Sequence, residues 1–90
     1  MNGRRQQLED INVALSEILD NIYRAKTDVE TVKDDEEISK DNIPESLQGT
    51  ERFSDMVENI DDLEQAVDMF DELENTIEDI QGLLEDAISR

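Results

Sequence analysis

The sequence predicts an all-α protein in which two long amphipathic helices form an antiparallel hairpin. Two observations lead to this prediction. Apolar residues recur at heptad spacing in both halves of the 90-residue chain, which is typical of helices that pack along one stripe. The only proline, Pro44, lies between the two halves, where it interrupts helical structure. We therefore expect a single helical-hairpin domain over residues 1–90.

The first heptad series begins at Leu8 and runs without interruption to Val32. Its apolar residues lie alternately three and four apart, at heptad positions a and d. They are Leu8, Ile11, Leu15, Ile18, Ile22, Ala25, Val29 and Val32. A charged fraction of 38% is also typical of disordered chains, but the unbroken register favours a helix, from about residue 5 to about residue 36. Lys26 and Lys33 fall at the neighbouring e positions, where we expect them to pair with acidic residues of the second helix.

The second series repeats the pattern with one irregularity. Its apolar residues are Phe53, Met56, Ile60, Leu63, Val67 and Phe70, followed by Leu73, Ile77, Ile80, Leu84 and Ala87. Two three-residue steps meet at Phe70, so Glu74 stands where an apolar residue was due. This is either a stammer, which overwinds a coiled coil, or a wide apolar stripe without supercoiling. The neighbouring Met69, Leu83 and Ile88 favour the wide stripe of a four-helix bundle.

The connector between the helices spans about residues 37–50. Pro44 can open a short helical turn that runs through Leu47. Gly49 offers a second break, and Thr50 is a suitable N-cap for a second helix over residues 51–88.

A single hairpin of this size leaves the flanks of both apolar stripes exposed. We therefore expect a homodimer, as a four-helix bundle or coiled coil that also covers Ala14, Leu19, Met69 and Leu83. The alternative is that a different protein covers the stripes. The predicted oligomer seam consists of Leu8, Ile11, Leu15, Ile18, Leu19 and Ile22 in the first helix and Phe53, Ile60, Leu63, Phe70, Leu73, Ile77 and Leu84 in the second.

The composition excludes several classes of function. The formal net charge is −18, and the chain has no cysteine, histidine or tryptophan. We therefore expect no zinc site, no disulfide, no cofactor and no Ser–His or Cys–His catalysis, and we predict that the protein is not an enzyme. An excess of acids this large opposes direct binding to nucleic acid and to anionic membranes. No apolar run is long enough for a signal peptide or a membrane span, so the cytoplasm is the expected location.

Asp34–Glu45 has the twelve-residue length of an EF-hand calcium loop, with acids at its first and last positions. An EF-hand loop needs oxygen ligands at its third and fifth positions and glycine at its sixth. These positions hold Glu36, Ile38 and Ser39, so the loop does not match and no metal site is expected.

Acidic residues recur in pairs along the second helix and form the candidate partner-binding surface. Residues 51–90 hold fourteen acidic residues and two arginines, a net charge of −12. We expect one negative outer face formed by Glu58, Asp61, Asp62, Asp68, Asp71, Glu72, Glu78, Asp79, Glu85 and Asp86. The simplest interpretation is a solvated face, although like charges three or four residues apart destabilise a helix. The functional interpretation is recognition of a basic protein, for example a nucleic-acid-binding protein.

The spacing of these charges approximates that of a nucleic acid. Over residues 51–89 the charge is −13 on a helix about 57 Å long, or one charge per roughly 4 Å, against about 3.4 Å along one DNA strand. The main hypothesis is therefore a non-catalytic acidic interaction protein, with a DNA-mimic-like inhibitor of a nucleic-acid enzyme as its narrower form. The alternative is a structural or scaffold coiled coil that assembles through its apolar seams.

The connector also carries a resemblance. The segment Asn-Ile-Pro-Glu-Ser-Leu-Gln-Gly-Thr-Glu-Arg at residues 42–52 is similar to a segment Asn-Leu-Pro-Glu-Ser-Leu-Gln-x-Ser-Glu-Arg in small acidic helical proteins of gut Firmicutes and their phages. Phe53 departs from the glycine common in those proteins at the next position. The resemblance implies a phage or mobile-element context and no particular activity. The simplest role of the motif is a corner in which Pro44 fixes the backbone and Leu47 plugs the end of the bundle.

Overall fold

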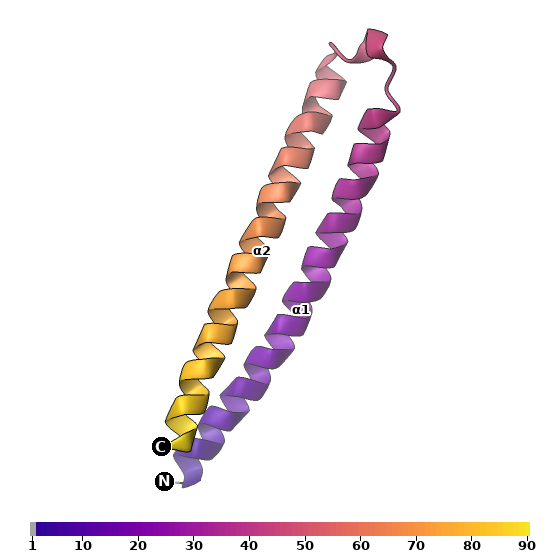
Figure 1. Cartoon of the computed structure of the whole chain (residues 1–90). Coiled ribbons are helices and arrows are strands. Elements are labelled where there is room, and N and C mark those ends of the chain that lie inside the picture. Colours follow the sequence, from indigo (N-terminus) through magenta and orange to yellow (C-terminus); the bar gives the residue numbers. More distant parts are fainter. Residues whose placement is uncertain (1) are drawn as a thin grey trace. The chain divides into compact units, whose positions relative to one another are not determined.

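The computed structural model describes residues 2–90, with side chains described from residue 3 onward. It contains the α-helix α1 (Asn2–Asp41), the short 3-10 helix η1 (Glu45–Leu47) and the α-helix α2 (Glu51–Ser89), as Figure 1 shows. The prediction of an all-α antiparallel hairpin is confirmed. Both helices end later than the sequence suggested, and α1 continues through the acidic residues 34–37 to Asp41.

Helix α1 ends just before the proline, as its chemistry requires. Asn42 and Ile43 still donate backbone hydrogen bonds to Ile38 and Lys40, each 3.1 Å long. The residue before a proline disfavours the helical conformation, and proline itself has no N–H to donate. Lys40 lies in the last turn, where a positive charge is favourable beside the exposed carbonyl groups.

The connector confirms the short turn predicted after Pro44. The Leu47 N–H donates to the Pro44 carbonyl over 2.8 Å and closes η1. Thr50 then acts as the N-cap of α2, because its Oγ1 accepts a hydrogen bond from the Phe53 N–H at 3.4 Å. The prediction that Leu47 plugs the end of the bundle is wrong, since its side chain is 50% exposed.

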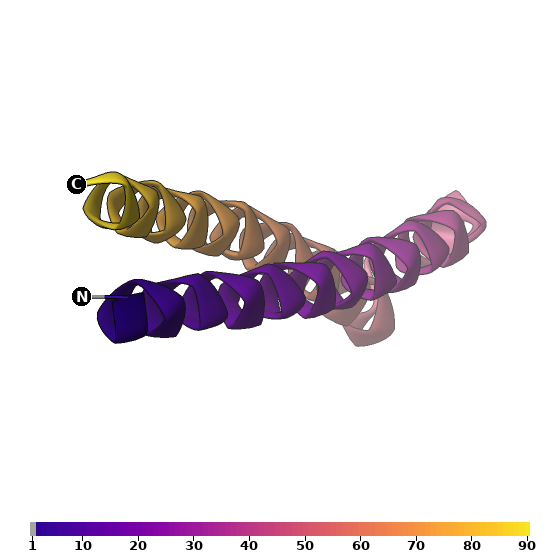
Figure 2. The ribbon, with the colours of Figure 1, turned by 90° about the horizontal axis from the view of Figure 1, so that it is seen from below.

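The chain forms two compact units, and each takes a segment from both helices. The first unit combines the described residues up to Arg24 with Phe70–Arg90, and the second unit is Ala25–Met69. Within each unit the two helical segments run antiparallel (Figures 1 and 2). The first turn of α1 and the last turn of α2 therefore belong to the same unit.

In the first unit, α1 is rotated relative to the sequence prediction. Leu8, Leu15 and Ile22 at position a are half-buried, as expected. The d residues Ile11 and Ile18 are instead 48% and 45% exposed. The e residues Asn12 and Leu19 are half-buried in their place. The side of α1 that is covered is therefore its a/e side, and the expected burial of the d positions is corrected.

Of the two alternatives for the irregularity in α2, the structure shows the wide apolar stripe and no stammer. From Phe70 onward the covered residues keep the heptad steps of three and four: Phe70, Glu74, Ile77, Gln81, Leu84 and Ile88. Glu74 and Gln81 thus take covered positions, whereas Leu73 and Ile80 are 45% and 40% exposed. The apolar residues that suggested a change of phase form a second stripe beside the first.

A reciprocal pair of polar side chains explains this choice of sides. Gln81 Nε2 donates to the main-chain carbonyl of Asn12 over 3.1 Å and to Ser16 Oγ over 2.9 Å. Asn12 Nδ2 donates in return to the main-chain carbonyl of Gln81 over 3.4 Å. A polar pair at covered heptad positions aligns two helices, because another alignment that kept these groups buried would leave them without partners.

The second unit covers both charged and apolar residues of α1. Its α1 segment presents Lys26, Lys33 and Lys40 among the half-buried residues. Its α2 segment nevertheless buries Met56 and Ile60, which are 9% and 6% exposed. Aliphatic lysine stems can cover apolar neighbours while the charged ends stay in water. One further contact joins the helices, a 3.2 Å hydrogen bond from Asn59 Nδ2 to Glu36 Oε2.

The cap of α2 can be tested with Thr50→Ala. The change removes the side-chain acceptor for the Phe53 N–H, so we expect the free energy of unfolding to fall by about 1 kcal/mol in urea titrations followed by circular dichroism. Thr31→Ala is the matched control, because Thr31 Oγ1 only donates to the carbonyl of Thr27 within α1. The control should be neutral or slightly stabilising. Equal losses in both variants would refute the cap.

The polar alignment can be tested with Gln81→Ala, measured at the same chain concentration as the wild type. Loss of both donated hydrogen bonds should lower the free energy of unfolding by about 1–2 kcal/mol. Gln6→Ala is the control, since Gln6 Nε2 bonds only to exposed Asp10 one turn away. A change of less than about 0.5 kcal/mol is expected there. An equal effect at both positions would contradict the assigned role of Gln81.

Candidate protein-binding surfaces

In the first unit, helix α2 divides into three sides of different chemistry. One side is covered and holds Phe70, Glu74, Ile77 and Gln81. The second side carries exposed acidic residues in pairs. The third side carries exposed apolar residues. Because successive residues are turned by about 100° around a helix, residues seven apart stay on one side.

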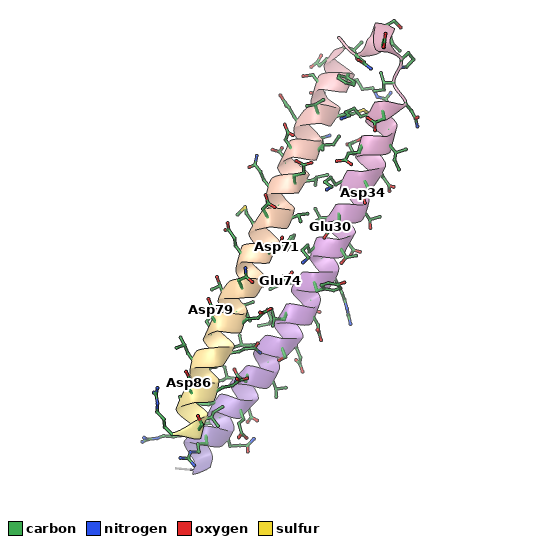
Figure 3. The ribbon with its side chains drawn as sticks, in the orientation of Figure 1. Glu30, Asp34, Asp71, Glu74, Asp79 and Asp86 are labelled. Carbon is green, nitrogen blue, oxygen red and sulfur yellow. The ribbon has the colours of Figure 1, made fainter. Side chains whose placement is uncertain are left out.

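The acidic side is built from pairs seven residues apart. It consists of Asp71, Glu72, Glu78, Asp79, Glu85 and Asp86, all of them exposed. Figure 3 shows Asp79 and Asp86 on the outer side of α2 and Glu74 between the helices. Arg90 is the only basic residue in Phe70–Arg90. The acidic side therefore presents a dense row of carboxylates to solvent.

The four remaining acids of the predicted surface lie in the second unit. Glu58, Asp61, Asp62 and Asp68 are exposed there as well. Glu58 lies two heptads before Glu72 and shares its heptad position, whereas the expected alignment of Asp61 and Asp62 with the later pairs depended on a stammer. In the unbroken register that the structure shows, a spacing of ten residues from Asp61 to Asp71 places the two pairs at different heptad positions. The prediction of a single row that includes Asp61 and Asp62 is corrected for this reason.

The apolar side of the first unit was predicted only in part, since Ala14 and Leu83 were expected on exposed flanks but Ile11, Ile18 and Leu73 were expected in the seam. We define it as the exposed residues Ile11, Ala14, Ile18, Leu73, Ile80, Leu83 and Ala87. Leu83 is the most exposed of the larger ones, at 69%. A pattern was present in the sequence: Leu73, Thr76, Ile80, Leu83 and Ala87 follow steps of three and four. This pattern was hard to recognise because Leu73 and Ile80 also fit the heptad series that was expected to be covered.

The predicted seam residues therefore divide into two groups. Those that are covered or half-covered within the chain are Leu8, Leu15, Leu19, Ile22, Phe53, Ile60, Leu63, Phe70, Ile77 and Leu84. Those that remain exposed are Ile11, Ile18 and Leu73. Their role in an oligomer stays a prediction, but only the exposed group is available for a contact outside the hairpin.

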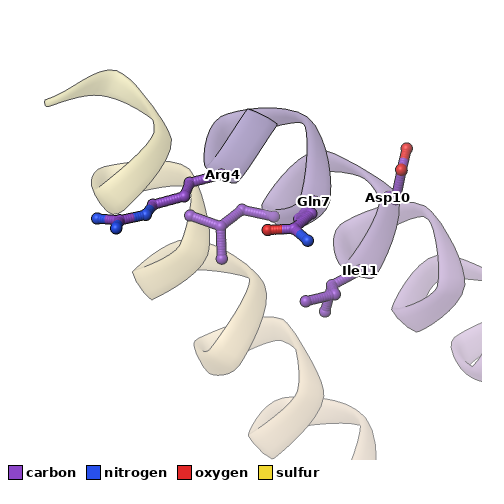
Figure 4. Close-up of a pocket in the computed structure, with 5 residues that line it drawn as sticks. Arg4, Gln7, Asp10 and Ile11 are labelled. Carbon is purple, nitrogen blue, oxygen red and sulfur yellow. The ribbon is translucent and has the colours of Figure 1, made fainter. Parts of the chain in front are cut away.

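Two open hollows lie next to these two sides. One is lined by Arg4, Gln7, Leu8, Asp10 and Ile11, all from α1, and thus continues the apolar side (Figure 4). Another lies beside Gly82, between the acidic pairs 78–79 and 85–86, with Leu83 at its edge. A Cβ added at Gly82 would meet no atom within 4 Å, so packing inside the chain does not require a glycine there.

A metal site and a membrane-spanning segment are two further possibilities. In the part of the chain that the structure describes, no three acidic side chains are grouped so that they could hold a metal ion. Within residues 2–90, neither helix has a stretch that is both long and apolar enough to cross a membrane. Asn12 Oδ1 is buried and makes no hydrogen bond, and it belongs to the contact with Gln81.

Comparisons with protein-family models, curated proteins and solved structures find no match to this chain. The resemblance of the connector at residues 42–52 therefore stays a prediction.

The open position at Gly82 predicts that Gly82→Ala stabilises the isolated protein. The added methyl group meets no atom, and alanine favours the helix over glycine by about 0.5–1 kcal/mol. The reverse change at an exposed alanine of the other helix, Ala14→Gly, should destabilise by a similar amount. Thermal unfolding of both variants checks the pair. A lower melting temperature for Gly82→Ala would show that the position is not open.

Proposed function

We propose that this chain is a non-catalytic protein-interaction module that binds a basic protein surface through the acidic side of α2. The observation that carries the proposal is the segregation of charge in the first unit. Six carboxylates occupy one exposed side in three pairs, while the other two sides of the helix hold the intrachain contact and the apolar residues. A helix selected only for staying in solution would intersperse lysines among the acids and gain from their pairing.

The energetics of the acidic side favour a partner of opposite charge. Successive pairs on the acidic side, such as Glu72 and Asp79, lie seven residues or about 10 Å apart along the helix, so their like charges repel one another at about the Debye length. A surface of lysines and arginines relieves this repulsion and releases counterions when it binds. Complementary charge of this kind mainly raises the rate of association and selects the partner.

A narrower form of the proposal is mimicry of nucleic acid. The average spacing of one charge per roughly 4 Å along α2 is close to the 3.4 Å or so of a DNA strand. The partner class would then be a nucleic-acid-binding protein or enzyme, which the chain would inhibit by occupying its basic groove. The resemblance of the connector to proteins of phages and their hosts is compatible with such a role in a mobile-element context.

The alternative function is a structural coiled coil that assembles through apolar contacts. The exposed apolar side favours it, because water covers these side chains in the isolated hairpin. The two functions use different sides of α2, so variants can separate them.

The proposal predicts that charge reversal on the acidic side weakens binding to a basic protein. The test variant carries Glu72→Lys, Asp79→Lys and Asp86→Lys, three exposed positions seven residues apart. The probe is a lysine- and arginine-rich DNA-binding domain, with duplex DNA as the competitor, and the dissociation constant is measured at two salt concentrations. We expect at least a tenfold loss of affinity and a shallower dependence on salt.

The matched control places the same three charge reversals on α1, at the exposed residues Glu9, Glu17 and Asp20. Both variants have the same net charge, so only the location differs. The control should lose less than about threefold in affinity, since these residues lie outside the acidic side. Equal losses of affinity in both variants would show that only the net charge matters. A dissociation constant that does not change with salt would refute the electrostatic mechanism.

A further inference from the structure

The apolar side of the first unit is one surface formed by both helices. On α1, Ile11 and Ile18 directly precede the covered residues Asn12 and Leu19. On α2, Leu73 and Ile80 stand in the same relation to Glu74 and Gln81. In both helices, the exposed apolar residue comes one position before a covered residue. It is therefore turned away from the facing helix by the same angle, about 100°, in both helices. In an antiparallel pair, equal rotations bring both sets to the same side of the pair.

The heptad positions along this surface hold no carboxylate in a chain that has 26 of them, and Asp10 lies only at its edge, in the hollow beside Ile11. The α1 positions along it hold Arg4, Gln7, Ile11, Ala14, Ile18 and Asn21, and the α2 positions hold Leu73, Thr76, Ile80, Leu83, Ala87 and Arg90. The acidic side of α2 faces elsewhere. Two such surfaces can therefore meet without bringing the acidic sides together.

The corresponding positions in the second unit are different. In α1 the same heptad positions hold Asp28 and Asp35, and in α2 they hold Asp55 and Asp62. Val32 is exposed in this unit at the position equivalent to Ile18. Apolar contact is thus favoured in the first unit, and like charges oppose the same contact in the second.

We infer that a second copy of this chain packs on the apolar side of the first unit. The four helical segments then form a bundle in which each copy contributes two apolar stripes. The stripes keep steps of three and four residues, which is the spacing that lets side chains of facing helices interdigitate. A twofold axis places the same residues on both sides of the contact. Because the heptad positions of this surface hold no carboxylate, two copies of it can pack without repulsion between acidic side chains.

The surface area of the chain leaves room for this interface. The accessible area is 6692 Å², whereas a folded monomer of 10.3 kDa exposes about 5,400 Å² by the usual scaling with mass. The excess is larger than the roughly 800 Å² that each partner covers in an interface of standard size. Only Met56, Ile60 and Ile77 are buried among the hydrophobic residues that the structure describes. The hairpin therefore has little core of its own, and association would enlarge it.

The test is the mass in solution, measured by sedimentation equilibrium over a range of chain concentrations. The full chain should approach twice 10.3 kDa. Ile18→Lys and Leu83→Lys should each raise the dissociation constant of the dimer by about 10- to 100-fold, because each removes a buried aliphatic side chain from the contact. Lysine is chosen because it lowers the net negative charge and so reduces repulsion between copies.

Val32→Lys is the matched control, at the same heptad position of the same helix as Ile18 but in the second unit. It should leave the dissociation constant within about threefold of the wild type. Circular dichroism checks that all three variants remain helical, which is expected because the substituted side chains are exposed. A chain that stays at 10.3 kDa at all concentrations overturns the inference, as does equal weakening by Val32→Lys and Ile18→Lys.

Salt separates this inference from the proposed function. Sodium chloride screens repulsion between two chains of charge −18, so the dimer should become tighter as salt rises. Binding of a basic protein should become weaker under the same change. A dimer that dissociates with added salt would contradict an apolar contact.

Discussion

The contact between Asn12 and Gln81 determines which sides of the two helices meet in the first unit. Their reciprocal hydrogen bonds require that each side chain face the other helix. Once they do, Glu74 is drawn into the covered series and Ile11, Ile18, Leu73 and Ile80 are turned outward. The exposed apolar side thus accompanies the hydrogen bonds between Asn12 and Gln81, which give partners to both side-chain amide nitrogens while Asn12 Oδ1 stays buried without one.

Much of the fold could be predicted because it depends on local chemistry. The heptad spacing gave two helices, Pro44 and Gly49 gave the break between them, and Thr50 gave the cap of α2. The rotation of each helix could not be predicted, since apolar spacing does not distinguish a contact within the chain from one outside it. Glu74 and Gln81 are polar residues at covered heptad positions, so an apolar pattern alone does not identify the covered side. The exposure of the acidic pairs was predictable, whereas the acid-free apolar side emerged only once the covered side was known.

The two units solve the same packing problem with different side chains. The first unit aligns its helices through uncharged polar groups and covers Ile77. The second covers Met56 and Ile60 beside half-buried lysines, whose positive ends also offset part of the excess negative charge. The neighbouring acids make the second unit unsuited to apolar association. The exposed apolar side and the three acidic pairs both lie in the first unit.

Helix α2 carries three sets of residues that barely overlap in position. Phe70, Ile77 and Gln81 serve the fold, Leu73, Ile80 and Leu83 form the apolar side, and the paired acids form the acidic side. Substitutions at separated positions act nearly independently on stability. In evolutionary terms, mutation and selection can therefore alter one side of the helix while leaving the other two intact. A lineage of such proteins could exchange one basic partner for another by drift on the acidic side, while its hairpin and its apolar contact stay unchanged.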